Sequence, residues 1–311
     1  MEKVKIDEIE LVLSHPDQQE RAWIGQEELM EQILACWLIV APDDLPLCPR
    51  LVGKPGMGKT TLAIAAARTL GKPVYIYQCT MDTRPEDLII TPVLSESGKI
   101  QYHASSLLTA ALKGGVAVLD EANRMSEKSW ASLAPLLDHR RYVESIVAGV
   151  KIHAHPEFRC CVTMNDDAST YEVPDYITSR LQPMIQLDFP EREEEMAILK
   201  YNLHFAPDEI LELTLDFLQR SHEAQLDHSI RDGLSIARYV LKIRNYSPRE
   251  RKLPWKDTFQ KAVEQVLGKD ALDIKKRSSQ INRQNLANLA FLEDFFTNEK
   301  DWLEPNEDTD E

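Results

Sequence analysis

Apolar and polar positions along residues 1–190 follow a pattern that predicts strands and helices in turn. Short, nearly continuous apolar runs indicate buried strands over 47–52, 73–79, 115–120, 158–164 and 184–188. The stretches between them predict helices over 25–40, 59–70, 104–113, 126–138 and 173–181. Such alternation is typical of an α/β fold, here a three-layer αβα core built around a parallel sheet.

Two segments interrupt this alternation, and both have the pattern of β-hairpins. Residues 89–103 contain Pro92 and a Ser-Glu-Ser-Gly turn sequence. Residues 141–154 alternate in polarity on either side of an Ala-Gly turn. We therefore expect two hairpin inserts within the α/β core.

The pattern changes after Pro190, where an acidic run begins. Amphipathic helices near 191–203, 207–224, 229–244 and 255–267 predict a small α-helical domain. Residues 271–296 suit a further helix, which either packs against this domain or binds a partner, and an acidic tail follows. The predicted organisation is an N-terminal extension (1–19), an α/β core (20–190, with inserts at about 89–103 and 141–154), a helical lid (191–270), and a C-terminal helix and tail (271–311).

Composition and charge narrow the possible functions. Hydrophobic residues make up 43% of the 311 residues and charged residues 28%, as in ordinary soluble proteins. No apolar run approaches the ~18 residues of a membrane span. The five cysteines lack metal-ligand spacing and the chain does not start like a signal peptide, so we expect a cytoplasmic protein with buried thiols. The net charge of −15 disfavours binding to nucleic acid or to an anionic membrane.

The most specific motif lies between the first predicted strand and the helix that follows it. Residues 53–60, Gly-Lys-Pro-Gly-Met-Gly-Lys-Thr, fit the phosphate-binding pattern G-x-x-x-x-G-K-[ST]. Such a loop directs backbone N–H groups at phosphate oxygens, and the helix N-terminus adds partial positive charge. We expect Lys59 to reach the β- and γ-phosphates and Thr60 to offer its hydroxyl to Mg²⁺. The alternative, a plain glycine turn before a helix, does not require the full pattern.

A second motif supplies carboxylates. Residues 115–121, Gly-Val-Ala-Val-Leu-Asp-Glu, form an apolar strand that ends in Asp120 and Glu121. Asp120 is predicted to hold the Mg²⁺ shell, and Glu121 to polarise the attacking water. Two carboxylates at a strand end can instead cap the next helix. The phosphate-binding loop upstream favours nucleotide hydrolysis.

With these two motifs, the chain resembles the AAA+ ATPases, and within them the MoxR-like, dynein-related group. The resemblance covers roughly residues 20–270. It rests on Ile24-Gly25-Gln26-Glu27, on the string Gly-Gly-Val-Ala-Val-Leu-Asp-Glu-Ala-Asn-Arg over 114–124, on Asn165 after the next strand, and on Ser179-Arg180. The nucleotide-binding residues that it implies are Ile24, Gly25, Gly53, Pro55, Gly56, Met57, Gly58, Lys59, Thr60, Thr61 and Arg231, with Thr60 and Asp120 on the metal.

The resemblance also implies roles for three polar residues. Asn165 is expected to orient the attacking water or to touch the γ-phosphate, although a turn Asn beside Asp166 is the simpler interpretation. Arg180 is expected to act as the arginine finger of a neighbouring subunit, with Arg124 and Arg141 as rivals, and a local ion pair as the alternative. Sensor two is assigned to Arg231, at the start of a lid helix, with Arg249 as the second candidate.

The function implied is Mg²⁺-dependent ATP hydrolysis by a homo-oligomeric ring, a hexamer, that remodels, assembles or activates a protein client. A von Willebrand A-type protein is a candidate partner. Two other classes stay open. One is a nucleic-acid-linked motor of the restriction or helicase-loader type, for which GTP is an alternative nucleotide. The sequence has no basic stripe, and this argues against such a motor. The other is a slowly hydrolysing, nucleotide-switched scaffold, for which damaged catalytic motifs would be expected.

Overall fold

The computed structural model describes residues 2–19, 22–95, 98–166, 172–246 and 253–272. The chain divides into two compact units, Met1–Ile198 and Leu199–Glu311. The predicted helix over 271–296 and the acidic tail lie almost wholly outside the described residues.

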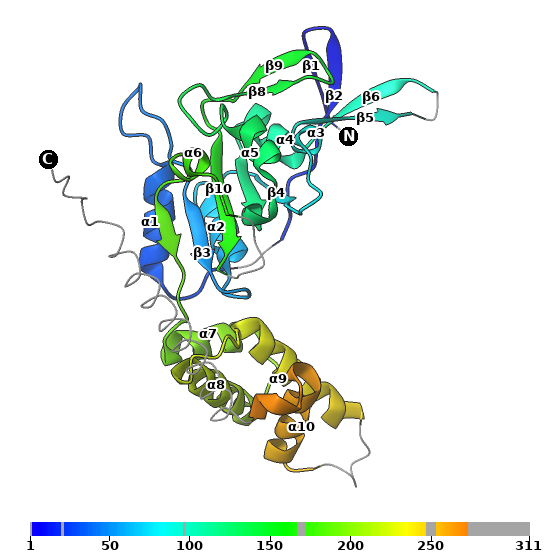
Figure 1. The fold of residues 1–311 in the computed structure, drawn as a ribbon. Coiled ribbons are helices and arrows are strands. Elements are labelled where there is room, and N and C mark those ends of the chain that lie inside the picture. Colours follow the sequence, from blue (N-terminus) through cyan, green and yellow to red (C-terminus); the bar gives the residue numbers. More distant parts are fainter. Residues whose placement is uncertain (1, 20–21, 96–97, 167–171, 247–252, 273–311) are drawn as a thin grey trace, which may run out of the picture. The chain divides into compact units, whose positions relative to one another are not determined.

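The first unit is built on a parallel sheet (Figure 1). Within the described residues, the sheet has the strand order β11-β3-β10-β7-β4. Its members are β3 (Arg50–Gly53), β4 (Val74–Gln78), β7 (Val116–Asp120), β10 (Arg159–Asn165) and β11 (Met184–Gln186). Each lies within or beside an apolar run from which a strand was predicted. The central strand β10 is buried along its whole length, which explains the apolar run in its middle.

Helices cover both faces of this sheet and give three layers. On one face, α1 (Glu27–Trp37) and α2 (Lys59–Thr69) bury Ile33, Trp37 and Leu62 against the sheet. On the other face, α4 (Ser106–Lys113) and α5 (Glu127–Leu133) bury Leu107, Leu108 and Trp130. The predicted α/β fold class is therefore confirmed. The helix predicted over 173–181 is only the short α6 (Asp175–Thr178).

The two predicted hairpins are present in the described part of the chain. β5 (Ile90–Leu94) pairs with β6 (Ile100–Ala104), and β8 (Tyr142–Ser145) pairs with β9 (Val150–His153). A short helix, α3 (Pro85–Leu88), precedes β5. The extension predicted over 1–19 contains two strands that the sequence pattern did not indicate, β1 (Lys3–Ile6) and β2 (Ile9–Val12). β2 pairs in parallel with β6, so the N-terminal residues enlarge the first hairpin into a sheet (Figure 1).

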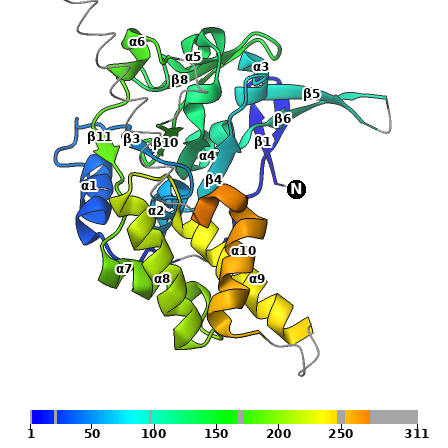
Figure 2. The same cartoon turned by 60° about the horizontal axis from the view of Figure 1, so that its bottom comes forward.

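The second unit is helical (Figure 2). Helix α7 (Arg192–Asn202) crosses the division between the units. It is followed by α8 (Asp208–Glu223), α9 (Ile230–Tyr246), α10 (Trp255–Leu267) and a 3₁₀ turn, η3 (Lys269–Leu272). α8, α9 and α10 pack on one another through buried residues such as Leu218, Ile236 and Val263. No helix within the described ranges is long and apolar enough to cross a membrane.

Candidate functional site

The phosphate-binding loop joins the end of β3 to the start of α2. Gly56 and Gly58 have φ values of 84° and 90°, in the left-handed region that favours glycine. Gly53 is required for a different reason, because a Cβ there would lie 2.6 Å from the carbonyl oxygen of Leu187. Gly58 is also the N-cap of α2, so the loop ends at the positive end of that helix. Backbone and helix together form an anion-binding cradle.

Lys59 closes this cradle. Its side chain is buried, with 6% of the residue exposed. The Nζ donates hydrogen bonds to the carbonyl oxygens of Gly53, at 2.8 Å, and Lys54, at 2.9 Å. A buried ammonium needs partners of this kind, and phosphate oxygens are of the same kind. The loop thus fits the polyphosphate of a nucleotide.

Thr60 and Asp120 bring the two sequence motifs together. The Thr60 hydroxyl donates to Asp120 Oδ1 at 2.6 Å. Thr163 of β10 donates to the same oxygen at 2.7 Å and accepts from the backbone N–H of Glu121 at 2.9 Å. Hydroxyl and carboxylate oxygens are the ligands that Mg²⁺ prefers, so this set fits a magnesium ion beside the phosphates. Sequence reasoning missed Thr163; its one signal is a hydroxyl in an otherwise apolar strand.

Glu121 follows Asp120 in an uncommon backbone conformation. Its φ of 54° ends β7 abruptly and opens the 3₁₀ turn η1 (Ala122–Arg124). The carboxylate then lies between two partners: Asn165 Nδ2 is 3.5 Å from Oε1, and Arg124 Nε is 2.6 Å from Oε2. The structure therefore brings Glu121 and Asn165 together at the carboxyl ends of β7 and β10.

Asn123 stabilises the position of Asn165 beside Glu121. Its side chain is buried and its Nδ2 donates to the carbonyl oxygen of Asn165 at 2.9 Å. This bond fixes the backbone that carries the Asn165 side chain. In the sequence, Asn123 stood out only as part of the family resemblance, without a role of its own.

The segment containing Ile24 and Gly25 lies against the phosphate-binding loop. A Cβ at Gly58 would lie 3.1 Å from the indole of Trp23. The segment is held on its other side by Glu194 of α7, whose Oε1 accepts from the backbone N–H of Gln26 at 2.6 Å. Gly25 has a φ of 75°, and a Cβ there would lie 2.9 Å from the Glu194 carboxyl group. Trp23 and Glu194 were not predicted, since neither belongs to a motif.

Arg180 lies at the amino-terminal ends of the parallel strands, whereas the phosphate-binding loop lies at their carboxyl ends. It follows α6 and precedes β11, and Met184 at the start of β11 pairs with Arg50 at the start of β3, whereas the loop follows the end of β3. Arg180 Nε lies 3.2 Å from Asp138 Oδ2, and its Nη1 donates to the carbonyl oxygen of Tyr176. Within the chain, the structure does not bring Arg180 to the nucleotide-binding loop.

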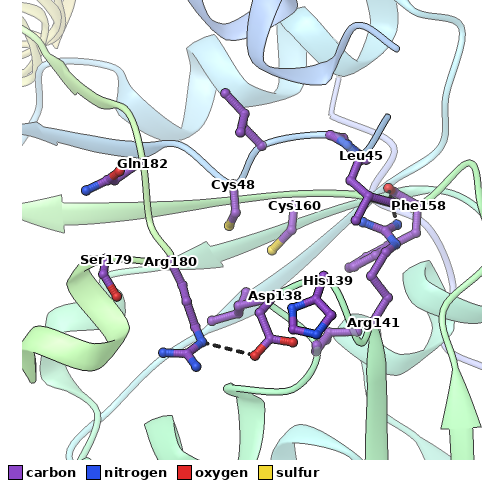
Figure 3. Close-up of a pocket in the computed structure, with 14 residues that line it drawn as sticks. Leu45, Cys48, Asp138, His139, Arg141, Phe158, Cys160, Ser179, Arg180 and Gln182 are labelled. Atoms are coloured by element: carbon purple, nitrogen blue, oxygen red, sulfur yellow. Dashed lines mark hydrogen bonds and ion pairs between the residues drawn. The ribbon is translucent and has the colours of Figure 1, made fainter. Parts of the chain in front are cut away.

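Arg180 and Asp138 border a cavity of about 300 Å³ that also contains Cys48, Cys160 and Phe158 (Figure 3). Asp138 is the anionic side chain of this cavity. Arg140 donates to both of its oxygens, at 2.7–3.2 Å, and holds the pKa of the Asp138 carboxyl well below its usual range.

The rival fingers have partners inside the chain. Arg141 Nη2 donates to the carbonyl oxygen of Phe158 at 2.9 Å, and its guanidinium lies 5.6 Å from the Phe158 ring centroid. Burial lowers the pKa of Arg141. Arg124 forms the ion pair with Glu121 described above. Both guanidiniums therefore also have partners within the chain.

The sensor-two candidates belong to the second unit. Arg231 is exposed on the first turn of α9, whose start is capped by Ser229 and Asp232: the N–H of Ser229 donates to Asp232 Oδ2 at 2.8 Å. Arg249 lies outside the described residues. The choice between them stays a prediction.

The chain is similar to AAA-domain proteins of known sequence and structure. Residues 50–181 match the family model of the AAA domain (dynein-related subfamily). Protein CbbQ of Hydrogenophilus thermoluteolus is 31% identical over 150 residues, which cover 47% of this chain and 55% of CbbQ. Protein MoxR of Paracoccus denitrificans is 29% identical over 157 residues, 50% of this chain and 45% of MoxR.

A third relative is the gas vesicle ATPase GvpN of Ancylobacter aquaticus, 28% identical over 211 residues, which cover 60% of this chain and 58% of GvpN. The chain thus spans about half the length of the curated relatives it matches. Among solved structures, the RuvB branch migration motor of Thermotoga maritima superposes with a TM-score of 0.52 over 78% of this chain and 69% of that one. At 18% sequence identity, this similarity shows the fold alone.

Proposed function

Because residues 50–181 form an AAA domain of the dynein-related subfamily, we propose that the chain is a Mg²⁺-dependent ATPase that works as a homo-oligomeric ring. Proteins with this domain hydrolyse nucleotides in general. We propose in addition that the nucleotide is ATP, that the metal is Mg²⁺, and that the chain forms a ring that acts on a client.

The proposal of hydrolysis rests on one observation. Five polar side chains converge at the carboxyl ends of adjacent strands: Lys59, Thr60, Asp120, Glu121 and Asn165. Lys59 and the loop N–H groups would hold the β- and γ-phosphates. Thr60 and Asp120 would hold Mg²⁺, which when bound neutralises charge on the phosphates. Glu121 would accept a proton from the attacking water, and Asn165 would orient that water. Because all five residues are intact, a scaffold that has lost hydrolysis is disfavoured.

The ring is proposed from the position of Arg180. It lies at the amino-terminal ends of the parallel strands, away from the phosphate-binding loop of its own chain, so we infer that it would contact a nucleotide bound to another copy of the chain. A guanidinium supplied in this way stabilises the charge that develops on the transferred phosphoryl group. A closed ring, proposed as a hexamer, lets every copy both give and receive an Arg180.

The client is proposed to be a protein that the cytoplasmic ring remodels, assembles or activates, with a von Willebrand A-type protein as the first candidate partner. The name of GvpN, a gas vesicle ATPase, supports an ATPase within this group of relatives. The net charge of −15 supports a protein client over nucleic acid.

The direct test is phosphate release by the purified chain with ATP or GTP, with Mg²⁺ or with excess chelator. The proposal predicts release with ATP that stops when the chelator removes Mg²⁺. Equal release in the presence of the chelator would contradict the role given to Thr60 and Asp120.

A further inference from the structure

Asp138 is a mostly buried carboxylate between two arginines. It lies between α5 and β8, its side chain is 13% exposed, and it contacts both Arg140 and Arg180. Arg140 donates two bonds to Oδ2 and one to Oδ1 from its side chain, and its backbone N–H also donates to Oδ1, at 3.0 Å. Figure 3 shows the Arg180 side chain pointing toward Asp138, with their contact drawn as a dashed line.

These contacts fix the orientation of the Arg180 guanidinium. Asp138 holds Nε, and the carbonyl oxygen of Tyr176 holds Nη1. Nη2 makes no hydrogen bond with any described residue. A guanidinium is planar, so two held nitrogens set the direction of the third. Arg180 is thus kept in one orientation with donor capacity to spare.

The local charge is also suited to receiving an anion. Asp138 faces two guanidiniums, so one carboxylate is shared between two positive charges. Arg140 takes most of the hydrogen-bonding capacity of this carboxylate, and the charge of Arg180 is only partly compensated. An additional anion, such as a terminal phosphate, would compensate the remaining positive charge of Arg180.

We propose that Asp138 positions Arg180 for its action as an arginine finger on a second copy of the chain. This inference rests on the proposed function of Arg180. Asp138 holds Arg180 by Nε so that the terminal nitrogens face the γ-phosphate of ATP bound to a second copy of the chain. Asp138 touches no substrate itself and acts only through Arg180. Because Asp138 follows α5, the helix after the Glu121 turn, the same segment connects the hydrolytic site of one copy to the finger that this copy offers to the next.

The first test is a double-mutant cycle of ATP hydrolysis on Asp138→Asn and Arg180→Ala. Asp138→Asn keeps the shape but weakens the hold on Nε, so kcat should fall about 10- to 100-fold, as for a misplaced catalytic group, with KM for ATP unchanged. Added to Arg180→Ala, the same change should have no further effect. Asp138→Glu, which keeps the charge, should recover part of the rate.

Arg140→Ala is the matched control. It removes the other partner of Asp138 and leaves the contact with Arg180, so its kcat should stay within a few-fold of the wild type. Thermal unfolding of each variant identifies any that fail to fold. If Asp138→Asn misfolds, the cycle is run with Asp138→Ala, which also removes the charge.

The second test is mixing. Asp138→Asn subunits keep an intact hydrolytic site, and Glu121→Gln subunits keep an intact finger, so the mixed oligomer should regain activity above either variant alone. A wild-type kcat in Asp138→Asn would overturn the inference. So would a loss of kcat that is equally large when Asp138→Asn is made in the wild type and in Arg180→Ala. Failure of the proposed function looks different: Arg180→Ala itself would then retain the wild-type rate.

Discussion

The Thr60 hydroxyl donates a 2.6 Å hydrogen bond to Asp120, 60 residues further along the chain. Thr60 lies in the first turn of α2, which follows β3, and Asp120 ends β7, with β10 between these strands in the sheet. Because all three strands are parallel, their carboxyl ends meet at one edge. The contact therefore joins the phosphate-binding loop to the acidic motif and places two metal-type ligands side by side.

Lys59→Ala should abolish nucleotide binding. Lys59 is the buried cation of the loop, and no backbone N–H can replace its charge at the terminal phosphates. Isothermal calorimetry with ATP measures the loss, and Lys128→Ala, an exposed lysine on α5, serves as the control. Unchanged affinity in Lys59→Ala would refute the assignment of the loop.

Gly58→Ala should lower both stability and nucleotide affinity. At φ 90° an L-residue is strained, by about 1–2 kcal/mol, and the new Cβ would press on Trp23. Gly71→Ala is the matched control, because Gly71 also has a positive φ, 65°, but no atom within 4 Å of its Cβ position. Thermal unfolding should show both variants destabilised, whereas ATP titration should show weaker binding in Gly58→Ala alone.

Arg180→Ala should leave ATP binding intact and suppress hydrolysis by ~10³–10⁵-fold, the range for a dominant arginine finger. Mixed with Glu121→Gln subunits, it should regain activity, since some sites then face an intact finger. No recovery despite demonstrated co-assembly would place the action of Arg180 within its own subunit and favour Arg124 or Arg141.

The Asp138 carboxylate should make a pH-dependent contribution to stability. Its native pKa is depressed, chiefly by Arg140 and also by Arg180, so the contribution is present above the unfolded pKa of about 3.9 and lost as the pH falls below it. At pH 7 the wild type should be about 1–2 kcal/mol more stable than Asp138→Asn. Urea unfolding at several pH values should show this gap closing below about pH 4; a constant gap would contradict it.

Local patterns predicted most of the α/β core. The parallel strands lie in or beside largely apolar runs, and the phosphate-binding loop is a contiguous motif, so both can be recognised without distant contacts. The dynein-related part of the resemblance is confirmed by the family match over 50–181, and the MoxR-like part by the similarity to the relatives MoxR and CbbQ. The roles of the individual site residues stay predictions.

The missed features depend on contacts between distant segments. β1 and β2 are four residues each, and β2 pairs with the distant strand β6, with Leu11 opposite Tyr102, which no local pattern reveals. Thr163 is significant because it contacts Asp120 on the neighbouring strand. Glu194 is significant because it contacts Gln26, 168 residues away. The ion pair between Asp138 and Arg180 likewise joins a loop and a turn whose sequences carry no shared signal.

Hydrolysis at the Glu121 site is the central claim, and phosphate release by Glu121→Gln tests it most directly. The amide preserves the size of the side chain but cannot accept a proton from water, so ATP affinity should stay near the wild-type value while turnover falls by ~10²–10⁴-fold. Binding by calorimetry and phosphate release under saturating Mg²⁺ and ATP are measured on the same preparations. Wild-type turnover in Glu121→Gln would contradict the account, because the water would then be activated by another residue.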